Sequence, residues 1–288
     1  MSLLPNPFRG FLMLARLGNV FMAALGTVAG GYAATESPAL LPLALAMLGT
    51  MMGVAGGNAL NDARDAPIDV RAHPNRPIPR GDLRVRDAIV AGWVLLGAAV
   101  LVLAGTGSLA TLVLGVLFVL GLAWYEYRLK PLGLQGNIAI SVIVGGTFLL
   151  GATAVAPTDP GLIGRLLPKI GWTPIIFGLL AALATMAREI FKDLQDQEFD
   201  AAWRETLPLR MGARTAFSLA RLFLLLGIFF GLLPAALRHF DRTYVILVLP
   251  ALSVFAVTIF VTEAGRAAFW TKIGMILALI AFVATGLI

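Results

Sequence analysis

The sequence contains no cysteine, only two histidines, and few charged residues, which make up 13% of its 288 positions. The absence of cysteine excludes a disulfide framework, thiolate catalysis and a zinc–thiolate site. His73 and His239 lie too far apart in the sequence for their spacing to suggest a pair of metal ligands. A soluble domain carries roughly 25% charged residues. The composition therefore excludes a soluble globular enzyme and a disordered chain.

Hydrophobic residues are abundant: they make up 59% of the chain, and the mean hydropathy is +0.88. A helix that crosses a bilayer needs about 20 mostly apolar residues, and the apolar runs here are apolar on all sides, as in helices rather than barrel strands. We therefore predict an all-α integral membrane protein that forms one membrane domain over residues 1–288. The nine predicted spans are 11–34, 39–60, 88–106, 108–124, 137–156, 172–187, 214–237, 243–262 and 270–287.

The charged residues are distributed unevenly between the two sides of the predicted membrane domain. The chain has 22 Lys and Arg against 16 Asp and Glu, a net charge of +6. Sixteen of the basic residues lie on the side of the N-terminus and of two polar loops at about 61–87 and 188–214, and four lie on the other side. The positive-inside rule places the first side in the cytoplasm. Topology accounts for the basic excess, so we expect no nucleic-acid partner.

The two polar loops form an internal repeat, since a shift of 131 residues aligns them. This predicts two parallel pseudo-repeats, about 11–130 and 131–262, each a four-helix bundle, with one extra helix around a central chamber. A pseudo-twofold axis along the membrane normal would bring the two acidic loops face to face. The identical pairs are Asp62 and Asp193, Asp65 and Asp196, Asp69 and Asp200, Pro77 and Pro208, and Gly81 and Gly212.

The acids in these loops have a spacing that favours a metal site. If the helix persists, Asn61, Asp65 and Asp69 lie on one helical face, and Asp196 and Asp200 share another. Carboxylates stacked in this way repel each other unless a cation is present. Oxygen ligands select Mg²⁺ or Ca²⁺, and Mg²⁺ usually takes some of its ligands from water and substrate phosphate. The pattern therefore implies a phosphorylated ligand.

Basic residues stand beside the acids, where such a ligand would need them. Arg76 follows the first motif, Arg188 and Lys192 precede the second, and Lys130 ends a polar link after the fourth predicted span. Arg and Lys bind phosphate oxygens, so together with a metal they predict a diphosphate site. The alternative is that these cations only neutralise the acids.

The motif Asn61/Asp65/Asp69 after the second span and the motif Asp196/Asp200 after the sixth resemble those of the UbiA superfamily of intramembrane prenyltransferases. The resemblance implies a polyprenyl diphosphate donor, with Mg²⁺ bridging the diphosphate to these five residues. It also implies that the four aspartates are catalytic, and that ionisation of the allylic C–O bond leaves a carbocation that an acceptor attacks. An apolar chamber would hold the prenyl tail and exclude water.

Other positions fit the family pattern less completely. Lys130 resembles the lysine of the family's Tyr/Lys motif, but it lies one residue further from Tyr125 than in the quinone-type pattern, so Tyr125 and Tyr127 both remain candidates for diphosphate binding. Asp62 and Asp193 are extra acids, for which metal binding, hydrogen bonding and acceptor binding stay open.

Within the superfamily the sequence is most similar to the digeranylgeranylglyceryl phosphate synthases of archaeal ether-lipid synthesis. This implies transfer of a geranylgeranyl group to geranylgeranylglyceryl phosphate, and the alternative is an aromatic acceptor such as 4-hydroxybenzoate. Phe199 departs from the glycine usual in those enzymes. The stretches that carry the likeness are 57–62, 129–137, 188–193 and 206–208.

Arg16 and Asn19 lie in the first predicted span, where an arginine is costly unless it faces the bundle interior. We expect both to bind the anionic group of the acceptor, which is a phosphate for the ether lipid or a carboxylate for an aromatic acid. The alternative is that Arg16 only anchors the helix at the membrane surface. A transporter built from parallel repeats is the competing class of protein, but transporter charges usually lie near the membrane midplane. The acids here cluster at helix ends, which favours the enzyme. The sequence leaves the oligomeric state open.

Overall fold

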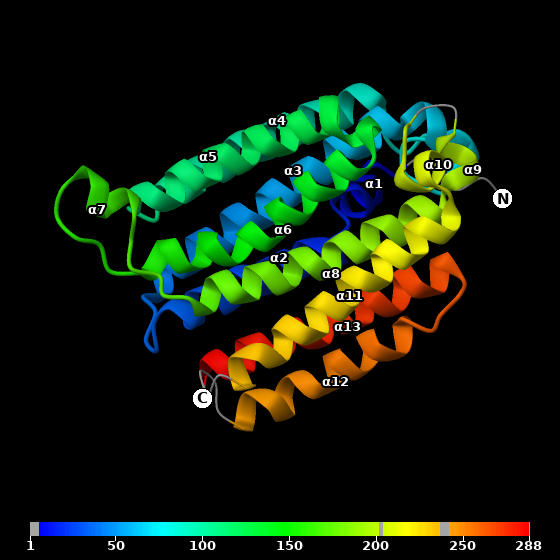
Figure 1. Ribbon diagram of the computed structural model, residues 1–288. Helices are drawn as coiled ribbons and strands as arrows, with labels where there is room; N and C mark the ends of the chain where they lie inside the picture. Colours follow the sequence, from blue (N-terminus) through cyan, green and yellow to red (C-terminus); the bar gives the residue numbers. More distant parts are fainter. Residues whose placement is uncertain (1–5, 202–203, 237–241, 288) are drawn as a thin grey trace.

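The computed structural model describes residues 6–201, 204–236 and 242–287 (Figure 1). Within these ranges the chain forms helices and turns and no β-strand. The helices are α1 (Pro7–Ala15), α2 (Leu17–Ala34), α3 (Leu40–Ala72), α4 (Val85–Ala104), α5 (Leu109–Trp124), the π-helical turn η1 (Tyr125–Leu129), the 3₁₀ turn η2 (Lys130–Leu132), α6 (Leu134–Val155), α7 (Leu162–Leu166), α8 (Thr173–Gln195), α9 (Gln197–Asp200), α10 (Leu207–Met211), α11 (Ala213–Ala236), α12 (Arg242–Thr258) and α13 (Ala264–Leu287).

Eight helices in the described ranges are long and apolar enough to cross a membrane. They are α2, α3, α4, α5 with the turns that follow it, α6, α8, α11 and α13. This confirms the prediction of an all-α, multi-pass membrane protein. The eighth predicted span, 243–262, is the exception, because α12 is an apolar helix of only 17 residues.

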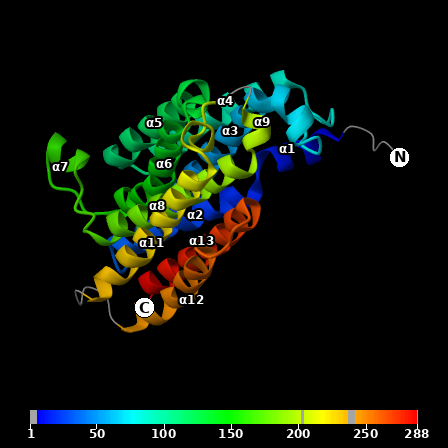
Figure 2. The same ribbon diagram turned by 45° about the vertical axis from the view of Figure 1, so that its right-hand side comes forward.

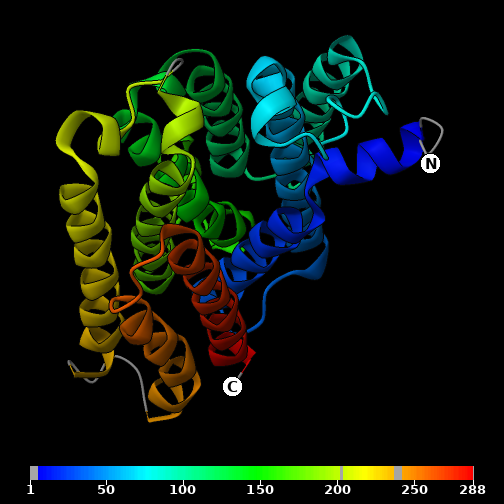
Figure 3. The ribbon, with the colours of Figure 1, turned by 90° about the vertical axis from the view of Figure 1, so that its right-hand side faces the viewer.

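The first predicted span, 11–34, is wrong at its start. The chain breaks at Arg16, whose backbone is left-handed with φ of 51°. α1 therefore leaves the axis of α2 and projects from the bundle (Figure 3). At the break, the side chain of Asn58 donates a hydrogen bond of 2.8 Å to the free carbonyl of Ala15. Hydropathy could not detect the break, because α1 is itself apolar. Its Phe8 is 75% exposed.

The two predicted polar loops, 61–87 and 188–214, begin with helix rather than loop. α3 continues to Ala72 through Pro67, and α8 continues to Gln195, followed by the short helices α9 and α10. Hydropathy falls where polar side chains begin, whereas the backbone hydrogen bonds of a helix do not require apolar residues. Both extended ends lie at the same end of the bundle (Figure 1).

Helix α2 lies at the centre and packs against α3, α6, α8 and α13 (Figure 2). The crossing of α2 and α6 depends on small residues: a Cβ on Gly30 would overlap the carbonyl of Phe148, and one on Gly151 would overlap the carbonyl of Thr27. Close backbone approach at small residues is a common way for membrane helices to pack. It brings α2, α6, α8 and α13 around one cavity.

Candidate functional site

A cavity of about 630 Å³ lies between the central helices. This volume is within the range of roughly 300–1,000 Å³ that is usual for ligand sites. Its interior is apolar, and its polar side chains gather at the end where α3 and α8 carry the acidic motifs. The apolar lining includes Phe148, Leu180, Val248, Leu252, Phe255 and Phe282. The polar lining includes Arg16, Asn19, Asn58, Asn61, Arg76, Tyr125, Glu126, Arg188, Glu189, Lys192 and Lys272.

The first motif lies on one face of α3, as predicted, because the helix persists through Pro67. Asn61 faces the cavity: its Oδ1 accepts a hydrogen bond of 2.9 Å from Arg16, and its Nδ2 lies 3.3 Å from both carboxylate oxygens of Glu126. Asn61 thus links the break before α2 to the turn η1.

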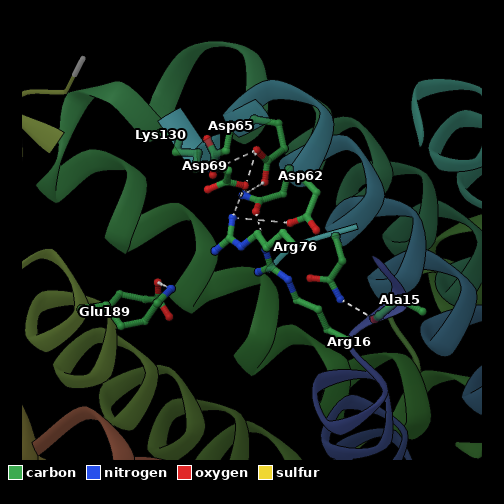
Figure 4. Close-up of polar contacts among 12 residues, drawn as sticks. Ala15, Arg16, Asp62, Asp65, Asp69, Arg76, Lys130 and Glu189 are labelled. Atoms are coloured by element: carbon green, nitrogen blue, oxygen red, sulfur yellow. Dashed lines mark hydrogen bonds and ion pairs between the residues drawn. The ribbon is translucent and has the colours of Figure 1, made fainter. Parts of the chain in front are cut away.

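Asp65 joins three segments of the chain (Figure 4). Its carboxylate accepts hydrogen bonds of 2.8 Å from Lys130 and 2.9 Å from Arg204. Lys130 also lies 3.3 Å from Glu126. The side chain of Asp65 is only 13% exposed, and buried carboxylates are tolerated when they are paired in this way.

Asp62 and Asp69 are both 2% exposed and also pair with arginines. Arg76 folds back from the loop after α3, so that its Nη1 lies 2.6 Å from Asp69 and 3.7 Å from Asp62. Arg16 donates to Asp62 as well (Figure 4). Asp62, undecided from the sequence, therefore receives ion pairs from two arginines beside the cavity.

Turn η1 separates the two candidate tyrosines. Tyr125 is 8% exposed and lines the cavity. Tyr127 is 37% exposed, stacks on Trp93 with ring centroids 6.4 Å apart, and lies under the guanidinium of Arg64. Tyr127 is therefore not part of the cavity lining, since neighbours two apart in a helical turn point to different sides.

Near the second motif, the cavity is lined mainly by residues that precede the motif on α8. Arg188 and Lys192 line the cavity as predicted, and both pair with Glu189, at 2.7 Å and 3.0 Å. Asp193 accepts a hydrogen bond of 2.8 Å from Asn137 on α6. Asp196 ends α8 and is not part of the cavity lining; the side chain of Asp200 lies outside the described part of the structure.

Among the side chains that the structure describes, which leave out Asp200, the acids of the two motifs do not converge. No group of three or more Asp, Glu or His side chains in the described ranges is close enough to hold a metal ion on its own. Arginine and lysine side chains lie between the carboxylates and neutralise them. The donors still suit a hard cation, since α3 offers only carboxylate and amide oxygens. Mg²⁺ usually needs only one or two protein carboxylates, with substrate phosphate supplying further ligands.

Four charged residues at the cavity mouth were not assigned from the sequence. Glu126, Glu189 and Lys272 lie in long apolar helical segments, and an ionisable residue there is a functional candidate by default. From the sequence, that signal was available only for Lys272, which lies in the predicted span 270–287, because the predicted spans 108–124 and 172–187 end before Glu126 and Glu189. Arg204 reaches Asp65 from the segment before α10, which only the tertiary structure reveals.

Comparison with known proteins identifies the family. Two relatives, both digeranylgeranylglyceryl phosphate synthases, are similar along most of their length. The protein from Haloquadratum walsbyi is 36% identical, covering 84% of this chain and 82% of the relative. The protein from Methanopyrus kandleri is 35% identical, covering 96% of this chain and 99% of the relative.

Two solved structures have the same fold. A digeranylgeranylglyceryl phosphate synthase superposes with a TM-score of 0.73 at 24% identity, covering 98% of this chain and 99% of that one. A UbiA homologue from Archaeoglobus fulgidus, bound to GPP and Mg²⁺, gives a TM-score of 0.71 at 15% identity, covering 97% and 100%. Residues 20–273 match the UbiA prenyltransferase family. The chain is therefore a member of the UbiA prenyltransferase family.

Proposed function

We propose that this protein transfers a geranylgeranyl group from its diphosphate to geranylgeranylglyceryl phosphate, in ether-lipid synthesis. The observation that carries the proposal is the cavity, with an apolar interior and a mouth rich in Arg, Lys and carboxylates. Such a cavity accommodates a long prenyl tail and binds phosphate groups at one end. The relatives of similar length that are 35–36% identical share this activity by name.

The metal-binding role is proposed for Asn61, Asp65 and Asp69 on α3 and for Asp196 and Asp200 after α8. The oxygen donors on α3 and the homologue bound to GPP and Mg²⁺ support it. Bound Mg²⁺ would supply charge neutralisation for the departing diphosphate. The ion pairs of Asp65 and Asp69 with Lys130 and Arg76 would hold these carboxylates at the cavity mouth before the donor binds.

The diphosphate oxygens would be held by Lys130, Arg76 and Tyr125, with Arg188 and Lys192 on the opposite side of the mouth. The C–O bond between C1 of the prenyl chain and the diphosphate breaks, and its electron pair leaves with the diphosphate. Positive groups that surround the leaving group stabilise this charge separation. The acceptor hydroxyl oxygen then forms the new C–O bond to C1 and loses its proton.

Arg16 and Asn19 are the proposed acceptor-side residues, and both line the cavity. The ion pair of Arg16 with Asp62 and its hydrogen bond to Asn61 give it a further role, as a positioning residue for the first motif. The apolar lining beyond Asn19 would hold the tail of the acceptor.

The topology that we propose has nine crossings, with α12 as the short one, and with the N-terminus and the motif-bearing ends of α3 and α8 in the cytoplasm. The distribution of basic residues supports this orientation. The placement of both motif-bearing ends at one end of the bundle also agrees with the two proposed pseudo-repeats, 11–130 and 131–262 (Figure 1).

A product assay on the purified chain tests the activity. Geranylgeranyl diphosphate and Mg²⁺ are supplied with either geranylgeranylglyceryl phosphate or 4-hydroxybenzoate, each with and without EDTA. We expect product and released diphosphate only with the glyceryl phosphate, and none in EDTA. Product only with the aromatic acid would overturn the acceptor, and product that resists EDTA would overturn the metal requirement.

A further inference from the structure

Lys272 is a lysine in an apolar helix, and no ion pair to a described side chain accounts for it. It lies on α13, lines the cavity, and donates a hydrogen bond of 3.4 Å to Oδ1 of Asn19. None of the carboxylates whose side chains the structure describes, a set that leaves out Asp200, forms an ion pair with its Nζ within 4.0 Å. Charged residues inside apolar helices are costly and mark functional sites by default. Lys272 therefore calls for an anionic partner that the described part of the chain does not provide.

The charges on this side of the cavity are unbalanced. Arg188, Lys192 and Lys272 line it from α8 and α13, and Glu189 is the single acid that faces them from these two helices. Arg188 engages one carboxylate oxygen of Glu189 and Lys192 engages the other. The three cations therefore exceed the one acid by two positive charges. The charged neighbours of Lys272 are themselves cations, including Arg188 and Lys192. We call Arg188, Lys192 and Lys272 the basic wall.

The opposite side of the mouth is balanced. Four cations meet four carboxylates there: Arg16 pairs with Asp62, Arg76 with Asp69, Lys130 with Asp65 and Glu126, and Arg204 with Asp65. An anion that carries about two negative charges is therefore best accommodated at the basic wall. A phosphate monoester has a charge of about −1.5 to −2 at neutral pH, whereas a carboxylate has −1.

We propose that Lys272, together with Asn19, binds the phosphate of the acceptor, next to Arg188 and Lys192, whose proposed role is to hold the donor diphosphate. This inference deepens the proposed function and rests on it. It assigns a residue of the last helix to acceptor specificity, and it explains why a phosphorylated acceptor would be preferred over an aromatic acid. The acceptor tail would extend from this point into the apolar lining near Phe255 and Phe282, which α12 and α13 contribute.

Binding measurements on the full-length purified chain test the proposal. The Kd values of geranylgeranylglyceryl phosphate and of geranylgeranylglycerol, which lacks the phosphate, are measured in EDTA, so that no metal contributes. A hydrogen bond to a charged group contributes about 1.5–3 kcal/mol, so Lys272→Met should raise the Kd of the phosphate form roughly 10- to 100-fold. The Kd of the alcohol should stay within about twofold, and Lys272→Arg should retain most of the preference for the phosphate.

Arg266 supplies the matched control. It lies on the same helix but is 74% exposed and pairs with Glu263. Arg266→Met should leave both Kd values unchanged. If Lys272→Met does not fold, as judged by thermal unfolding, Lys272→Gln takes its place.

The outcomes separate the two proposals. If the wild-type chain makes product from the glyceryl phosphate but Lys272→Met leaves its Kd unchanged, the assignment of Lys272 is overturned and the proposed function stands. An equal rise in the Kd of the alcohol would also overturn the assignment, because it indicates a structural role. If the wild-type chain makes no product from the glyceryl phosphate, the proposed function itself fails.

Discussion

Each carboxylate of the first motif pairs with at least one basic side chain. That side chain comes either from a distant part of the sequence or from the loop after α3. Asp65 receives Lys130 and Arg204, which lie 65 and 139 residues away along the chain. Buried charges lose hydration, and pairing with hydrogen-bonding partners offsets part of that loss. The same Arg and Lys side chains are suited to phosphate oxygens. The site is therefore preorganised by groups that a diphosphate can also use.

The two tyrosines of turn η1 give a matched pair of variants. Tyr125 lines the cavity and Tyr127 stacks on Trp93 at the surface. Tyr125→Phe should lower kcat/KM about tenfold, if its hydroxyl donates to the charged diphosphate. Tyr127→Phe should remain within about twofold of the wild type. Steady-state kinetics with varied donor measures both, and a larger loss for Tyr127→Phe would contradict the placement of the two side chains.

At the scale of the element, the π-helical turn accounts for the extra residue between Tyr125 and Lys130. The backbone N–H of Lys130 bonds to the carbonyl of Tyr125, which is an i→i+5 bond. The longer turn absorbs one residue and keeps Lys130 directed toward Asp65. Single-turn π-helices are rare and occur frequently at functional sites. The spacing that departed from the family pattern in the sequence is thus compatible with the same lysine role.

Two glycine-to-alanine substitutions, one at the crossing of α2 and α6 and one on α4, should have opposite effects on stability. A methyl group at Gly151 would overlap the backbone of Thr27, whereas nothing lies within 4 Å of a methyl group at Gly97 on α4. Gly151→Ala should destabilise the protein by about 1–3 kcal/mol, and its Tm should fall by several degrees. Gly97→Ala should leave Tm unchanged or raise it, since alanine favours helix by about 1 kcal/mol. Thermal unfolding in one detergent compares the two, and equal Tm values would refute the close approach.

For the whole molecule, the orientation in the membrane can be tested because the chain has no cysteine. Single cysteines are introduced at Asn75, in the exposed loop after α3, and at Lys169, which is 69% exposed at the other end. A membrane-impermeant maleimide should label Lys169→Cys in intact cells, and Asn75→Cys only after permeabilisation. The cysteine-free parent should remain unlabelled. The reverse pattern would place the motif-bearing ends outside the cytoplasm.

The class of fold could be predicted from the sequence because hydrophobicity is a local property. Runs of apolar residues placed eight of the nine predicted spans on long or short apolar helices, but they missed the polar extensions of α3 to Ala72 and of α8 to Gln195. They failed at the start of 11–34. There the break at Arg16 joins two apolar helices, and its left-handed backbone is accompanied by side-chain bonds to Asn61 and Asp62. Those partners lie more than 40 residues away along the chain, so no local sequence pattern indicates the break.

The sequence by itself determined the all-helical membrane fold, the family and the face of α3 that carries Asn61, Asp65 and Asp69, because apolar runs and the spacing of motif residues are local properties of the chain. Only the tertiary structure decided which charges meet at the cavity. It placed Tyr127 against Trp93 rather than in the cavity lining, brought Arg204 to Asp65, and left Lys272 facing the cavity with Asn19. The physical reason is that ion pairing and burial depend on distance in space, and helices far apart in the sequence must pack before those distances exist.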